Sequence, residues 1–215
     1  MAGWESLRID LLRYLEDLPG ALVVLPSPHT ERRHEQRFRI QLAAWAVGVA
    51  DELQAKYGDL VELQVGAMTF PGGQLVVSQH ALELFGEPAE AAGLSVETLA
   101  PLRIRSGYFA KLDVLVRNHA AHPQVLLTSG DLHTAVTDSS GQVVGRYAGP
   151  HNAPRIGFPL EPGQSRPVPA LVGTASLAPE LGYAVPPGQW SLVVSLRTET
   201  SGHLLAAPLD LTVTP

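Results

Sequence analysis

The chain contains no cysteine among its 215 residues. A disulfide framework, a thiolate metal site and a cysteine nucleophile are therefore excluded. Charged residues are also scarce, at 17% of the chain, whereas apolar residues make up 45%. This balance supplies enough apolar material for hydrophobic cores and differs from the composition of a disordered chain.

Long apolar runs are also missing. None approaches the roughly 20 residues that a membrane helix needs. Residues 1–5 contain neither the basic segment nor the apolar segment of a secretion signal. We therefore expect a cytoplasmic protein without a membrane partner.

Charge is unevenly distributed along the chain, which has a formal net charge of −6. Residues 1–97 hold 7 Lys or Arg and 14 Asp or Glu, for a net charge of −7, and the remainder carries +1. An acidic chain argues against nucleic acid as the main partner. The asymmetry indicates two modules.

The first half indicates helices that alternate with apolar strands. Apolar residues spaced three and four apart predict a helix over residues 4–17, and the run 21–25 predicts a buried strand. A stripe at helical spacing favours a long helix over residues 29–57, formed by Phe38, Leu42, Trp45, Val49 and Leu53. Phe38, Ile40 and Leu42 also alternate, so a strand over residues 37–42 is the alternative.

Further elements of the first half follow the long helix. Residues 60–65 predict a strand, residues 74–78 another, and residues 79–85 a short helix. If the strands around the long helix are adjacent and parallel, residues 21–68 form one β–α–β unit. The first half is therefore predicted to be an α/β or α+β domain over residues 1–86.

Residues 87–101 are rich in Ala, Glu and Gly and form the linker candidate. Beyond them, period-two alternation of apolar residues recurs in four places, around Leu112–Val116, Leu132–Val136, Trp190–Leu196 and Leu209–Val213. The turn signal Ser139-Ser140-Gly141 predicts a hairpin. Residues 102–215 are therefore predicted to form an all-β antiparallel sandwich.

Four segments of the second half carry a family resemblance. They are Val114-Leu115-Val116-Arg117-Asn118, the hairpin 134–144, Leu160-Glu161-Pro162-Gly163-Gln164-Ser165 and Val185-Pro186-Pro187-Gly188-Gln189-Trp190. Over residues 102–214 the chain resembles bacterial immunoglobulin-like modules, including those of the intracellular proteinase-inhibitor type. The resemblance implies an immunoglobulin-like sandwich.

We expect no catalytic, cofactor-binding or metal-binding residues. Ser78, His80 and Glu83 lack the glycine-rich turn of a hydrolase nucleophile. His119 and His122 could bind a metal together with a carboxylate such as Asp131. The favoured interpretation is a polar loop that opens with Asn118 and closes at Pro123. No nucleotide-binding motif is present.

Two groups of residues are candidates for contact with another protein. Arg32, Arg33, Arg37 and Arg39 form a basic cluster that could hold an acidic partner, although interleaved glutamates favour a solvated helix face. Tyr108 and Phe109 could mark an interface, with core packing as the commoner outcome.

The sequence thus favours a non-enzymatic protein-interaction or adaptor protein with an immunoglobulin-like module. One alternative is an enzyme that binds a small ligand in the α/β half, favoured by a deep polar pocket beside residues 26–29 and 68–72. The other is a proteinase inhibitor that acts through a sandwich loop, favoured by a long exposed loop within residues 148–160.

Overall fold

The computed structural model describes residues 2–26, 37–71, 73, 81, 86–150 and 154–215. The strand predicted at residues 74–78 lies outside the described residues, as does all but Ala81 of the helix predicted at residues 79–85. Ser78, His80 and Glu83 lie outside them too. Within the described part of the chain, no helix is both long and apolar enough to cross a membrane.

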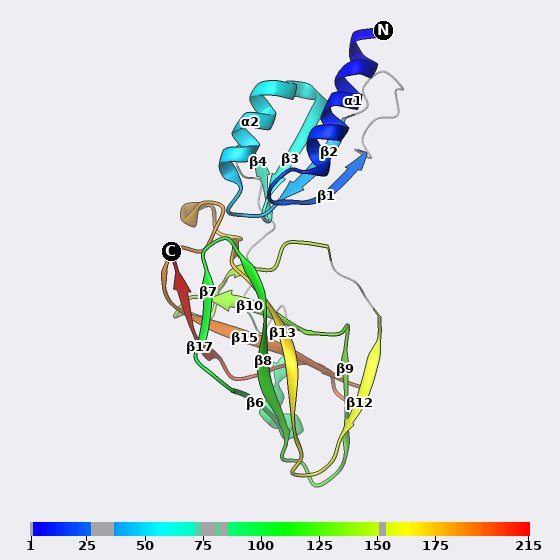
Figure 1. The fold of residues 1–215 in the computed structure, drawn as a ribbon. Helices are drawn as coiled ribbons and strands as arrows, with labels where there is room; N and C mark the ends of the chain where they lie inside the picture. Colours follow the sequence, from blue (N-terminus) through cyan, green and yellow to red (C-terminus); the bar gives the residue numbers. More distant parts are fainter. Residues whose placement is uncertain (1, 27–36, 72, 74–80, 82–85, 151–153) are drawn as a thin grey trace.

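Among the described residues, the first part of the chain forms a four-stranded sheet that carries helices α1 and α2 (Figure 1). Its elements are α1 (Ala2–Glu16), β1 (Ala21–Pro26), β2 (Phe38–Leu42), α2 (Val47–Tyr57), β3 (Val61–Val65) and β4 (Met68–Phe70). The strand order is β1-β2-β3-β4, with β2 and β3 parallel and the other two pairs antiparallel. The helix predicted at residues 4–17 and the strands predicted at 21–25 and 60–65 are confirmed.

One face of this sheet is apolar and the other polar, because alternate residues of a strand point to opposite faces. Both helices pack on the apolar face, in a core that includes Leu11, Leu15, Ile40, Leu42, Leu53, Leu63 and Val65. On the polar face Arg39 forms an ion pair with Glu62 at 2.8 Å, across the parallel pair of β2 and β3.

The helix predicted over residues 29–57 is wrong for residues 38–46. The strand alternative is correct, since β2 spans Phe38–Leu42 and α2 begins at Val47. As a strand, β2 forms backbone hydrogen bonds with β1 on one edge and with β3 on the other. A helix in this segment could not form these bonds between strands. The β–α–β unit is therefore β2–α2–β3, and β1 is an antiparallel addition to it.

The second part consists of strands, as predicted. They are β5 (Glu87–Pro88), β6 (Leu94–Thr98), β7 (Leu102–Arg105), β8 (Phe109–Asn118), β9 (Gln124–Thr128), β10 (Leu132–Thr137), β11 (Val143–Arg146), β12 (Ile156–Leu160), β13 (Ser165–Gly173), β14 (Ala175–Ser176), β15 (Gly188–Thr198), β16 (Gly202–Leu205) and β17 (Leu209–Thr214). Short 3-10 turns occur at Gly58–Leu60, Ala89–Ala92 and Pro179–Leu181.

These strands form one curled sheet whose main path is β12-β9-β15-β10-β13-β8-β6. The predicted hairpin is confirmed, because β10 and β11 pair antiparallel around residues 139–141. The sheet is mixed, however, and not antiparallel throughout. Parallel pairs join β10 to β13, β5 to β16 and β7 to β17.

Much of the predicted linker is part of this sheet. β5 pairs with β16, and β6 pairs with β8. Ala89, Leu94 and Val96 are buried in the same core as residues of β8 and β15. Residues 87–98 therefore belong to the β part, and whether the two parts fold independently stays a prediction.

The β part buries apolar residues on both faces of its central strands. Leu132, Val194 and Leu196 lie in the interior core of the curled sheet. On the outer face, Ala135 and Val193 pack with Ala67 and Ala81, which precede the β part in the chain. The first part of the chain thus covers a section of the outer face.

Candidate functional site

The two parts of the chain meet along a seam of small residues. A Cβ atom at Gly66 would lie 3.0 Å from the Cβ atom of Ala175, and one at Gly107 would lie 2.8 Å from the backbone nitrogen of Trp45. Both glycines also have positive φ angles, +57° and +79°, which other residues rarely adopt. Glycine at these two positions lets the two backbones approach closely.

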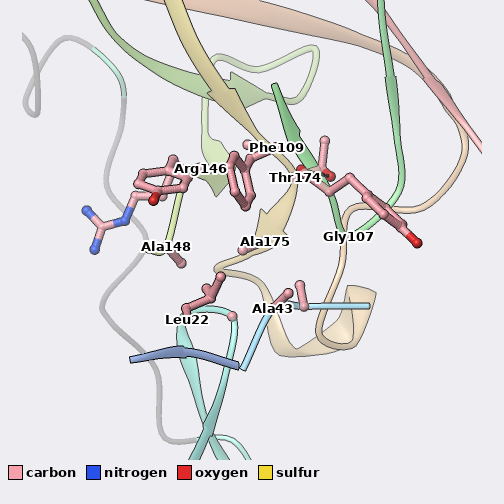
Figure 2. Close-up of a pocket in the computed structure, with 13 residues that line it drawn as sticks. Leu22, Ala43, Gly107, Phe109, Arg146, Ala148, Thr174 and Ala175 are labelled. Atoms are coloured by element: carbon pink, nitrogen blue, oxygen red, sulfur yellow. Dashed lines mark hydrogen bonds between the residues drawn. The ribbon is translucent and has the colours of Figure 1, made fainter. Parts of the chain in front are cut away.

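The hollow in the seam is almost filled. Figure 2 shows Leu22 and Ala43 of the first part opposite Ala148 and Ala175 of the second. The cavity between the parts measures about 10 Å³, which is room for one water molecule at most. This hollow is therefore a packed junction and not a ligand pocket.

Aromatic side chains lie along the rim of this junction. Trp45 stacks on Tyr108, with ring centroids 5.4 Å apart and an interplanar angle of 12°. The guanidinium carbon of Arg105 lies 4.9 Å from the centre of the Tyr108 ring. Phe109 meets Tyr147 edge to face at 5.0 Å. We call these five residues the aromatic seam.

Two members of the aromatic seam are open to solvent although they are large and apolar. Phe109 is 48% exposed and Trp45 is 39% exposed. Tyr108 is half-buried. Core packing, the commoner expectation for Tyr108 and Phe109, is therefore wrong for Phe109. Trp45 was predicted to lie on the apolar stripe of a helix, but it comes just before α2 and contacts the β part.

The predicted basic cluster is not a helix face where the structure describes it. Arg32 and Arg33 lie outside the described residues. Arg37 is exposed just before β2, and Arg39 lies within β2 and pairs with Glu62. No described contact joins Arg37 to the aromatic seam, so the candidate residues do not form one site.

The two candidate metal-binding histidines have separate polar partners. His119 Nε2 lies 2.9 Å from the Ser95 hydroxyl, and His122 Nε2 lies 3.2 Å from the Gln124 side-chain nitrogen. Asp131 is paired instead with Lys111. Among the described residues there is no group of three or more His, Asp or Glu side chains that could hold a metal ion.

The residues that carry the family resemblance hold turns in place. The buried Asn118 side chain donates hydrogen bonds to the carbonyl oxygens of Leu160 at 2.8 Å and His122 at 3.0 Å, and accepts one from the Ala120 amide at 2.9 Å. Asn118 thereby ties the end of β8 to the turn that follows β12. Asn118 therefore has a structural role.

The loop proposed for an inhibitor is shorter than residues 148–160, because β12 takes Ile156–Leu160. Residues 151–153 lie outside the described part of the chain. The pocket that would favour an enzyme was placed beside residues 26–29 and 68–72, of which residues 27–29 and 72 are not described. The described residues therefore show neither the long loop expected of an inhibitor nor the pocket expected of an enzyme.

A polar cavity that the sequence did not reveal lies on the outer face of β10, β15 and β16. It measures about 280 Å³, and charged or titratable side chains line much of it. We call it the outer-face cavity. In the sequence, the outer-face cavity corresponds to polar residues at alternate positions of β10 and β15. Periodicity alone would place these residues on a face exposed to solvent.

Comparisons with known proteins give little more. No family model and no curated protein matches the chain. Among solved structures, the CooA pilin subunit from enterotoxigenic Escherichia coli is 12% identical, with a TM-score of 0.26 over 57% of this chain and 99% of that one. The structural-genomics target SoR45 is 15% identical, with a TM-score of 0.25 over 56% of this chain and 83% of that one. Likenesses at these TM-scores carry no argument.

Proposed function

We propose that this chain is a non-enzymatic protein-binding protein, an adaptor or accessory component, and that it holds its partner through the aromatic seam. The observation that carries the proposal is the exposure of Trp45 and Phe109 beside an arginine. Tryptophan, tyrosine, phenylalanine and arginine are enriched in protein interfaces. Among them, tryptophan, tyrosine and arginine most often contribute the largest share of the binding free energy.

The aromatic seam is also held rigidly. Trp45 is fixed by stacking on Tyr108, and Phe109 by its edge contact with Tyr147. The backbone of Gly107 presses against that of Trp45. Because these rings are ordered before binding, a partner would lose little side-chain entropy by ordering them.

The chemistry of the seam indicates the kind of partner surface that would fit. Trp45 and Phe109 offer apolar area, which contributes roughly 25 cal/mol for each Å² buried. Arg105 is exposed, stacks on Tyr108 and donates one hydrogen bond to the Tyr108 hydroxyl at 3.3 Å. Its remaining N–H groups are available to donate to a carboxylate. The partner would present an apolar side chain next to an acidic one.

The β part fits the immunoglobulin-like scaffold in this proposal. Asn118 at the end of the V-x-N strand bonds to Leu160, which opens the L-x-P-G-x-S turn. Trp190 Nε1 donates to the Pro186 carbonyl at 3.0 Å in the second Pro-Gly segment. The first contact joins two of the motifs and the second lies within one of them, and both support an immunoglobulin-like sandwich that presents the aromatic seam at one end.

The test begins with photo-crosslinking in the native host. A photoreactive phenylalanine analogue replaces Phe109 in one variant and the exposed Glu161, on the turn after β12, in a control variant. A protein crosslinked at position 109 and not at position 161 is the expected result. Equal crosslinking at both positions would contradict the proposal.

Binding of the purified partner is then measured by calorimetry. Phe109→Ser should weaken binding at least about tenfold, or about 1.4 kcal/mol, whereas Glu161→Gln should leave it unchanged. Equal thermal midpoints for the two variants would show that both fold. Unchanged affinity in Phe109→Ser would reject the aromatic seam as the binding surface.

A further inference from the structure

The outer-face cavity is built by residues that face one another across the sheet. In the antiparallel pair of β10 and β15, His133 stands opposite Ser195. In the pair of β15 and β16, Arg197 stands opposite His203. Facing residues of such pairs have Cβ atoms about 4.5–5.5 Å apart. The four side chains therefore form one compact polar group.

This polar group interrupts an apolar surface. Directly beside it on the same outer face, Ala135, Val193 and Leu205 are buried together with Ala67 and Ala81. The residues that alternate with the polar group, such as Val194 and Leu196, lie in the interior core. The cavity thus begins where the cover provided by the first part of the chain ends.

The cavity carries two arginine charges without acidic partners. Arg197 extends from β15, and Arg155 comes from just before β12. Neither guanidinium group forms an ion pair or a hydrogen bond within the part of the chain that the structure describes. Both are therefore available to a ligand.

The one acidic residue of the lining is already matched by a lysine. Asp131 is 6% exposed, and its Oδ2 atom lies 3.0 Å from Lys111 Nζ. This pair leaves the charge of Arg155 and Arg197 uncompensated. The cavity is consequently cationic in a chain whose overall charge is −6.

Ser195 adds a hydroxyl donor to the cavity. The residue is only 7% exposed, yet its hydroxyl makes no hydrogen bond to any described residue. Ser195 lines the cavity, and its neighbours in β15, Val194 and Leu196, point to the interior core. Ser195 therefore lies on the same face of β15 as Arg197, which is two positions further along. The hydroxyl lines the cavity, so a ligand oxygen can accept a hydrogen bond from it.

We propose that the outer-face cavity binds a small phosphomonoester, with Arg155 and Arg197 on the phosphate oxygens and Ser195 donating a further hydrogen bond. Two guanidinium charges match the charge of about −1.5 to −2 on a phosphate monoester near pH 7. The volume of about 280 Å³ lies near the lower end of ligand pockets, so the organic part of the ligand is small. This proposal is independent of the aromatic seam.

The experiment is calorimetric titration of the full chain with glycerol 3-phosphate. Saturable binding of one molecule per chain is expected. Arg197→Gln and Arg155→Gln should each weaken binding about tenfold, as expected for the loss of a charge-assisted bond to phosphate. Arg103→Gln removes the same charge from an exposed position on β7 that does not line the cavity, and should leave affinity unchanged.

Thermal midpoints without ligand establish that each variant folds. Absence of saturable binding, or equal affinity in Arg197→Gln and Arg103→Gln, would overturn the proposal. Succinate in place of glycerol 3-phosphate tests the anion, and tighter binding of the carboxylate would overturn the phosphate assignment. A phosphoserine peptide tests the source of the phosphate, and tighter binding of the peptide would overturn the assignment to a small molecule.

Discussion

Replacement of Asn118 by alanine should destabilise the protein strongly. Asn118 has no exposed surface, and its side chain makes three hydrogen bonds to backbone groups. Each such bond contributes about 1 kcal/mol net, so the loss is about 3 kcal/mol. For a chain of this size the thermal midpoint should fall by about 6–12 °C.

Urea unfolding followed by circular dichroism and tryptophan fluorescence measures the effect. The control is Arg117→Gln, on the preceding, exposed position of β8, which should change the free energy of unfolding by less than about 0.5 kcal/mol. Asn118→Asp separates the donors from the acceptor, because a carboxylate can still accept from Ala120 but cannot donate to Leu160. It should be destabilised at least as much as the alanine variant.

A loss below about 1 kcal/mol in Asn118→Ala would refute this reasoning. It would mean that water or a backbone shift satisfies the carbonyl of Leu160 and the amide of Ala120 once the side chain is removed. A normal free energy in Asn118→Asp would refute the claim that the two donor bonds matter.

Three further predictions concern stability. Trp190 is half-buried, not largely buried as its position in an apolar strand suggests, so Trp190→Ala should cost about 2–3 kcal/mol in urea unfolding, and a cost near zero would contradict its packing role. Burial alone would raise the pKa of Asp138, but hydrogen bonds from Ser140, Gln142 and Gly141 outweigh it and lower the pKa below 3.8. The charged carboxylate therefore stabilises the turn above about pH 4, and this stabilisation is lost as the pH falls through the lowered pKa. In thermal melts, Asp138→Ala should remove the part of the acid sensitivity that comes from this carboxylate. A fragment of residues 87–215 should melt cooperatively at a higher temperature than residues 102–215, because the shorter one lacks the buried residues of β6; equal midpoints would show that β6 is dispensable.

The second half of the chain was predictable in its elements but not in its connections. Alternation located β8, β10, β15 and β17, because each has one face in the core. The parallel pairs could not be foreseen. β5, for example, has only two residues and pairs with β16 more than a hundred residues away, and nothing local in either segment specifies that contact.

The error over residues 38–46 has a simple physical origin. Phe38 and Leu42 lie four residues apart, which suits a helix, and together with Ile40 they also suit a strand. The choice depends on the neighbours, since β1 and β3 offer hydrogen bonds to both edges of this segment. A pattern confined to one segment cannot report what lies beside it.

The aromatic seam was only half visible in the sequence for the same reason. Tyr108 and Phe109 are adjacent and were candidates, but Trp45 lies over sixty residues earlier on what looked like a buried stripe. Gly107 permits the close approach of Trp45 to this region, because a Cβ atom at position 107 would lie only 2.8 Å from the backbone nitrogen of Trp45. Exposure at this rim results from the junction of the two parts and not from any local pattern.

The outer-face cavity shows the limit most clearly. The outward positions of β15 change from apolar to polar between Val193 and Ser195, which is the point where cover by Ala67 and Ala81 ends. In the sequence this change is indistinguishable from the edge of a solvated face. What makes the polar section a pocket is Arg155, which comes from the segment just before β12 and lines the same space as Arg197. Charge at an alternate strand position therefore becomes evidence for a binding site only when the tertiary structure supplies a wall opposite it.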